Sequence, residues 1–374
     1  MPQMFSLTGI KKDEFMKMQF GLLLTIVMLV SGQGFGAEKK VGVLFASYGD
    51  VDKPEEVEGY VKSALRDPDV APIPGFLKGL VVTLGWLFTG EGAVEEYRVI
   101  GGSNYRETAR KQADAVQKEL ATLGIEAKTY TGFIFTSPYV RDAMAEIQAD
   151  GITELLVFNQ GGQYSKVTQG INIREVQKYL KLHSEYTPKV TVVKSFSGDP
   201  RFRDLLADSI RTGLSENFAG ISPADVCIYL PSHGLPMYLP ENGDPAYFQM
   251  LSAYEDMKAR FPAHLVATGF QNHSELGAKW TLPDSEEQAH WLAASADCPN
   301  ILINGRISFT IDNIETLYDE NVGQRNVILE AKPEAKVVVQ KSFNYEPSFV
   351  HFLSLLSQDA LNGKGDLEIL SKPK

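Results

Sequence analysis

The sequence of 374 residues contains only two cysteines, Cys227 and Cys298. Two thiols are too few for a disulfide scaffold, a four-thiolate zinc site or a cysteine-bound iron–sulfur cluster, and their spacing leaves open whether they pair. Positive charge is also scarce, because 36 Lys and Arg stand against 47 Asp and Glu and give a formal net charge of −11. An acidic surface repels a phosphate backbone, so we expect no nucleic-acid partner.

Several sequence motifs of well-known enzyme classes are missing as well. No G-x-G-x-x-G follows a strand-like run, and there is no G-x-x-x-x-G-K-[ST], no H-E-x-x-H and no C-x-x-C. The segment Gly101-Gly102-Ser103 lacks the G-x-S-x-G frame of a hydrolase nucleophile elbow. Nucleotide binding, zinc proteolysis and serine hydrolysis therefore lose their main support in the sequence.

The N-terminus differs in composition from the rest of the chain. Residues 1–37 contain three lysines, then an apolar run over residues 20–30, then small residues up to Ala37. This order is typical of a secretory signal peptide, and the apolar run is shorter than the roughly 20 residues that span a bilayer. We therefore expect export, to a periplasm in a bacterium, with an uncleaved membrane anchor or a cytoplasmic arm as alternatives.

Beyond residue 38, short apolar runs typical of strands alternate with amphipathic segments typical of helices. The predicted strands are 40–46, 126–130, 154–158, 189–195, 225–230, 264–270 and 300–304. This alternation predicts an α/β fold with two similar, doubly wound parallel-sheet domains flanking a cleft. The predicted parts are a signal peptide (1–37), an N-terminal domain (38–185), a C-terminal domain (186–330) and a C-terminal segment (331–374) whose helix, from Tyr345 to Leu361, packs back on the first domain.

Residues 72–90 interrupt the alternation. After Pro72-Ile-Pro-Gly75, the segment from Phe76 to Phe88 is almost entirely apolar. An ordinary buried helix, a lip over an apolar ligand and an element that contacts a membrane surface all fit this composition.

Candidate site residues follow the predicted strands, because parallel α/β sheets bind ligands beyond the carboxyl ends of their strands. His233 stands after one such strand, where an imidazole can bind a metal, take up a proton near neutral pH, or only hydrogen-bond within a loop. Glu315 and Asp319 lie four residues apart in a predicted helix with Thr310 as its N-cap, which places both acids on one face. Facing a cleft, such acids attract a divalent cation or relay protons; otherwise they form a solvated helix surface.

Six segments, in order along the chain, resemble motifs of the ferrochelatase family. They are Leu44–Gly49, Tyr97–Ser103, Gln163–Ser165, Ser232–Pro236, Phe270-Gln271 with Trp280–Pro283, and Asp312–Tyr318. Each motif is short, but their common order covers most of the chain from residue 41 to 320. The chain departs from the family pattern at Gly162, where the family has proline, and at Asn313, where it often has histidine.

The resemblance implies insertion of Fe²⁺ into a porphyrin, either protoporphyrin IX or coproporphyrin III, to make haem. It implies that His233 and Glu315 form the catalytic pair, and that both handle the metal together with Asp319. Four further residues are implied in porphyrin binding: Tyr48, Tyr164, Ser165 and Trp280. The implied partners are the porphyrin and ferrous iron as substrates, with no permanently bound cofactor and a peripheral membrane contact through residues 76–88.

Other functions compete with this interpretation. The same fold serves a cobalt-type chelatase or an exported protein that only binds a tetrapyrrole or haem, and two α/β lobes after a signal peptide also describe a periplasmic solute-binding protein. Retention of both His233 and Glu315 favours the enzyme, because an apolar pocket alone would hold a porphyrin. Bacterial members of the resembled family are usually cytoplasmic or associated with the inner membrane, which is the alternative to export.

Overall fold

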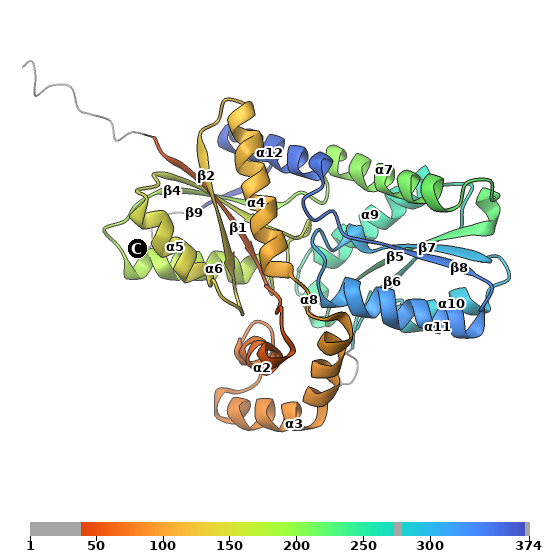
Figure 1. Cartoon of the computed structure of the whole chain (residues 1–374). Coiled ribbons are helices and arrows are strands. Elements are labelled where there is room, and N and C mark those ends of the chain that lie inside the picture. Colours follow the sequence, from red (N-terminus) through yellow and green to blue (C-terminus); the bar gives the residue numbers. More distant parts are fainter. Residues whose placement is uncertain (1–38, 273–278, 371–374) are drawn as a thin grey trace, which may run out of the picture. The chain divides into compact units, whose positions relative to one another are not determined.

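The computed structural model describes residues 39–272 and 279–370. From Lys40 onward the chain forms one compact unit that contains two sheets. The predicted signal peptide lies outside the described residues. The prediction of an α/β fold built on parallel sheets is confirmed (Figure 1).

The first sheet has five strands in the order β2-β1-β3-β4-β9. They are β1 (Val41–Ser47), β2 (Ala127–Phe133), β3 (Glu154–Asn159), β4 (Lys189–Ser195) and β9 (Asp366–Leu370). The first four are mutually parallel, whereas β9 is antiparallel to β4 at the sheet edge. Every residue of β1 is buried, as expected for a central strand covered on both faces.

The second sheet has four parallel strands in the order β6-β5-β7-β8. They are β5 (Val226–His233), β6 (Val266–Gln271), β7 (Asn300–Asn304) and β8 (Lys336–Gln340). The sheets do not follow the predicted domain limits. Strand β4 falls in the predicted C-terminal domain (186–330) but pairs with β3 of the first sheet. Strand β8 falls in the predicted C-terminal segment (331–374) but pairs with β7 of the second sheet. Strands β8 and β9 were not predicted from the sequence because both are short, partly exposed edge strands.

The helices connect and cover these strands (Figure 1). They are α2 (Val57–Arg66), α3 (Gly75–Ile100), α4 (Tyr105–Thr122), α5 (Val140–Ala149), α6 (Gln169–Leu182), α7 (Pro200–Asn217), α8 (Tyr238–Glu241), α9 (Ala246–Arg260), α10 (Ser285–Ala294), α11 (Arg325–Ala331) and α12 (Pro347–Leu361), with a π-helix, η5 (Glu315–Gln324), directly before α11. Short 3₁₀ turns are η1 (Pro54–Glu56), η2 (Pro223–Asp225) and η4 (Gly305–Ile307).

One apolar core is shared by both sheets. Phe45 and Phe158 of the first sheet belong to the same buried cluster as Leu230 and Leu302 of the second. Helix α12 contributes Phe352 to this cluster and lies beside α4 and β3 (Figure 1). The last helix therefore joins the two sheets into one packed unit.

A disulfide between Cys227 and Cys298 joins the start of β5 to the turn before β7. Both cysteines are fully buried. The pairing that the sequence left open is thus present in the second sheet, on the strand that ends at His233.

Helix α3 is one continuous helix of 26 residues over the segment that interrupts the sequence pattern. Its apolar side chains are largely exposed, with Phe76 at 87%, Leu87 at 71% and Phe88 at 86%. This exposure excludes the alternative of an ordinary buried helix. Among the described helices, α3 included, we find none that combines the length and apolar character needed to cross a membrane.

Candidate active site

His233 is the last residue of β5, the position at which parallel sheets present ligand-binding groups. Its backbone N–H lies 3.5 Å from Ser308 Oγ, and its ring lies 6.5 Å from that of Phe309 between ring centres. Burial lowers the pKa of His233 to about 4, although a hydrogen bond to the Gln271 backbone opposes the shift. The imidazole is therefore neutral at pH 7 and can accept a proton or donate a lone pair to a metal.

Glu315 is the first residue of the π-helix η5. The prediction that Thr310 caps this helix is wrong, because the Thr310 hydroxyl donates to the Gln160 carbonyl instead. A reciprocal pair closer to the helix takes that place: Asn313 N–H donates to Thr316 Oγ1 at 3.0 Å, and Thr316 N–H donates to Asn313 Oδ1 at 3.2 Å. Asn313, a departure from the family pattern, thus has a structural role at the helix start.

Gln271, the last residue of β6, connects the two predicted catalytic residues. It is the parallel-register partner of His233 in the second sheet. Its side-chain Nε2 donates to the backbone carbonyl of Glu315 at 3.3 Å. The fold therefore brings His233 and Glu315 to the same edge of the second sheet, and each is next to Gln271, a buried residue that was not predicted as a site residue.

Tyr48 follows β1 in the first sheet and also lies close to this strand end. Its ring contacts Phe135 at 4.6 Å between ring centres. Burial first and the negative charge of Glu315 second raise the pKa of Tyr48 above its ordinary value, so the phenol keeps its proton at pH 7. Tyr48, which follows a strand of the first sheet, is thus near enough to Glu315, at the edge of the second, for the charge of Glu315 to affect its pKa.

Two more carboxyl groups, those of Asp319 and Glu320, follow Glu315 in η5. Burial and then the charge of Glu315 raise the pKa of Asp319 well above its ordinary value. Glu320, which was not predicted from the sequence, is fully buried, and its pKa is raised well above normal by burial and by neighbouring acids. The prediction assumed α-helical spacing, whereas a π-helix bonds five residues along and also turns position 320 toward the interior.

The position of Glu320 depends on the absence of a side chain at Gly305. A Cβ atom there would lie 2.0 Å from Glu320 Oε1. Gly305 opens the 3₁₀ turn directly after β7, so the carboxyl group is enclosed against the end of the second sheet.

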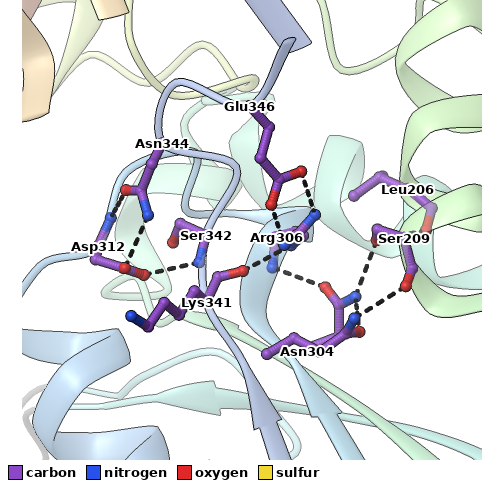
Figure 2. A network of polar contacts seen from close by, with 10 residues as sticks. Leu206, Ser209, Asn304, Arg306, Asp312, Lys341, Ser342, Asn344 and Glu346 are labelled. Atoms are coloured by element: carbon purple, nitrogen blue, oxygen red, sulfur yellow. Dashed lines mark hydrogen bonds and ion pairs between the residues drawn. The ribbon is translucent and has the colours of Figure 1, made fainter. Parts of the chain in front are cut away.

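The segment between β7 and η5 is hydrogen-bonded to residues 341–346, which follow β8 (Figure 2). Arg306 donates to both carboxylate oxygens of Glu346, at 3.0 and 2.7 Å. Asp312 accepts from Ser342 N–H at 2.7 Å and from Asn344 Nδ2 at 2.9 Å, and its own N–H donates to Asn344 Oδ1 at 3.0 Å. These contacts fix the chain that leads into Glu315.

The other predicted porphyrin-binding residues fall into two places. Trp280 lies between β6 and α10 and forms an isolated antiparallel bridge with Pro236, so it contacts the loop that follows His233. Ser165 instead donates to Asp244 Oδ2 at 2.8 Å, and Tyr164 has Lys194 Nζ at 5.0 Å from its ring centre. Within the described segments, the contacts found for Tyr164 and Ser165 are with residues other than His233 and Glu315.

The chemistry that this site allows follows from its ionisable side chains. In the described part of the chain, no three His, Cys, Asp or Glu side chains are grouped as ligands of one metal. A neutral imidazole and a carboxylate at one sheet edge can accept protons and bind a divalent cation.

Comparisons with known proteins place most of the chain beside one family. The family model described as Ferrochelatase matches residues 40–361. A ferrochelatase of Cyanothece sp. is 30% identical over 334 residues, covering 87% of this chain and 83% of that relative. A ferrochelatase of Geobacter metallireducens is 29% identical over 324 residues, covering 86% and 99%.

Solved structures resemble the fold at much lower sequence identity. SirB from Bacillus subtilis, determined with Fe³⁺, is 11% identical with a TM-score of 0.53, and the alignment covers 87% of this chain and 99% of SirB. A multi-domain Deinococcus radiodurans protein with structural similarity to chelatases has a TM-score of 0.50 at 11% identity, covering 88% of this chain and 57% of that protein. At such identity the likeness concerns the fold alone.

Proposed function

Because this chain belongs to the ferrochelatase family, we propose that it inserts Fe²⁺ into a porphyrin to form haem. The observation that carries the proposal is the placement of His233 and Glu315 at one sheet edge, each next to Gln271. Both residues stand in segments that resemble the family's motifs, and the family match spans both.

The reaction releases two protons, because Fe²⁺ replaces the hydrogens of two pyrrole N–H groups. A neutral imidazole and a carboxylate near the ring centre accept these protons and bind the incoming metal until the pyrrole nitrogens replace them. We assign the two roles to His233 and Glu315 jointly. Asp319, whose pKa responds to the charge of Glu315, extends the path along which metal or protons travel.

Fe²⁺ and the porphyrin are substrates in this proposal, and we assign no resident cofactor. We place Tyr48 and Trp280 beside the proposed reaction centre, because Tyr48 follows β1 and Trp280, which follows β6, bridges Pro236 on the loop after His233. We place Tyr164 and Ser165 at the porphyrin periphery, since Ser165 is bonded to Asp244. Protoporphyrin IX and coproporphyrin III are both candidates, and Tyr48 resembles a residue of the branch that uses coproporphyrin.

We also propose that the mature chain works outside the cytoplasm. The buried Cys227–Cys298 disulfide supports this location, because disulfides persist in oxidising compartments. The exposed apolar side chains of α3 support a peripheral membrane contact, which would bring the protein to the phase where apolar porphyrins dissolve.

The test is anaerobic incubation of the purified protein with Fe²⁺ and either porphyrin, followed by porphyrin and haem absorbance. We expect haem with at least one porphyrin. His233→Ala and Glu315→Gln should lower the rate about 100-fold or more while porphyrin binding remains measurable, because general acid–base groups contribute that much. Porphyrin binding without metallation by the unaltered protein would favour the binding protein, and insertion of Co²⁺ but not Fe²⁺ would favour the cobalt-type chelatase.

A further inference from the structure

A buried carboxylate in the loop after β1 contacts the helix that carries Glu315. Asp50 is 1% exposed. Its Oδ2 accepts a hydrogen bond from the backbone N–H of Ile314 at 3.0 Å, across 264 positions of the sequence. Ile314 directly precedes Glu315 and is the N-cap residue of η5.

The other oxygen of Asp50 is also fully engaged. Oδ1 accepts from the backbone N–H of Val51 at 2.8 Å and from the hydroxyl of Tyr97, a buried residue of α3. Three donors from three separate segments therefore converge on one carboxylate. An ionised carboxylate only accepts hydrogen bonds, so it suits three donors, whereas an amide of the same shape presents N–H groups to one or two of them.

The placement of Asp50 has an electrostatic cost. Burial and, to a lesser degree, the charge of Glu315 raise the pKa of Asp50 to about 7, although hydrogen bonds from Tyr97, Val51 and Ser103 oppose the shift. The charge of Asp50 also raises the pKa values of Tyr60 and Tyr105, so both phenols are near it. Asp50 therefore accepts its hydrogen bonds in surroundings that oppose its charge.

We propose that Asp50 is a positioning residue for Glu315: its carboxylate fixes the N–H of Ile314 and so sets the place of the Glu315 side chain opposite His233. The first N–H groups of a helix have no partner within the helix, and an acceptor there holds the first turn in place. Gln271 holds the Glu315 carbonyl from the second sheet, and Asp50 holds the preceding amide from the first. The metal-insertion role of Glu315 rests on the proposed function, whereas the hydrogen bond by which Asp50 fixes the start of η5 is independent of that function.

The first experiment measures the helix start directly, without any activity. Asp50→Asn should raise hydrogen exchange about tenfold or more in a peptide covering residues 312–318. Asp52→Asn is the matched control, because Asp52 lies in the same loop but bonds Arg106 at 2.8 Å. Unchanged exchange in Asp50→Asn, or equal increases in both variants, would overturn the positioning role whether or not the protein is a chelatase.

The second experiment asks whether Asp50 acts through Glu315. In the unaltered background, Asp50→Asn should lower kcat for Fe²⁺ insertion about 10- to 100-fold with little change in the porphyrin KM, since a small misplacement of a catalytic group costs that much. In a Glu315→Asp background, where the carboxylate is already displaced, the same change should cost less than about twofold. Multiplicative effects, or a loss confined to KM, would refute the proposal, and absence of insertion by the unaltered protein would refute the proposed function alone.

Discussion

His233 shows how one residue type acquires a role from its surroundings. A histidine after a strand is ambiguous in a sequence, because it can be a ligand, a base or a loop hydrogen-bonding group. Burial resolves part of the ambiguity, since it lowers the pKa of His233 to about 4 and keeps the ring neutral. A neutral imidazole at the end of β5 has the lone pair that metal binding and proton uptake both need.

The lowered pKa of His233 predicts a pH-dependent stability. Between about pH 6.5 and 4 the unfolded chain binds a proton that the folded chain does not, so the contribution of His233 is present above 6.5 and is lost as pH falls toward 4. From pH 7 to 4.5 we expect the unaltered protein to lose roughly 2–3 kcal/mol more unfolding free energy than His233→Gln. Urea unfolding at several pH values measures this difference, and parallel losses in the two proteins would contradict it.

Helix α3 illustrates how an element can be misjudged from composition alone. Its apolar run is as hydrophobic as that of a core helix, but the fold leaves the run on the surface. Its buried residues are Val82, Gly90 and Tyr97, and the Tyr97 hydroxyl donates a hydrogen bond to Asp50. Large exposed apolar surfaces of this kind mark sites of interaction with a partner or a membrane.

A membrane contact through α3 is testable with vesicles. We expect the protein to sediment with neutral phosphatidylcholine vesicles, and the double variant Leu87→Ser, Phe88→Ser to bind at least about tenfold more weakly, because each large apolar side chain contributes about 2 kcal/mol on transfer. Phe248→Ser is the control, since Phe248 is 57% exposed but lies on α9. Equal binding by all three proteins, or no binding by any, would contradict the proposed contact.

The whole molecule combines two sheets with a disulfide in the second. The Cys227–Cys298 bridge closes a loop of 71 positions around the strands that position the proposed catalytic pair. The presence of this disulfide bears on the compartment in which the protein works, since cytoplasmic thiols are normally kept reduced.

Export is therefore a prediction about the whole chain. The protein isolated from its natural cell should begin between Phe35 and Glu38, and both cysteines should resist alkylation until a reductant is added. N-terminal sequencing and the mass shift on alkylation measure these two properties. Full-length protein with two free thiols in a cytoplasmic fraction would refute export and leave the proposed chemistry untouched.

The sequence alone determined much of this protein, where the signal is local. Apolar runs and helical periodicity located seven of the described strands, because a buried strand needs consecutive apolar residues wherever it pairs. The rule that sites lie after parallel strands pointed to His233, and the order of short motifs pointed to Glu315. These inferences depend only on neighbours along the chain.

Only the tertiary structure decided the features that depend on distant contacts. The edge strands β8 and β9, the pairing of Cys227 with Cys298, and the bond from Ile314 to Asp50 all join segments that no local period connects. The π-helix was equally hidden, because it differs from an α-helix by one residue in its hydrogen bonding and not in its composition. Burial also set the pKa values of His233 and Asp50, since desolvation is a property of the packed molecule and not of a residue.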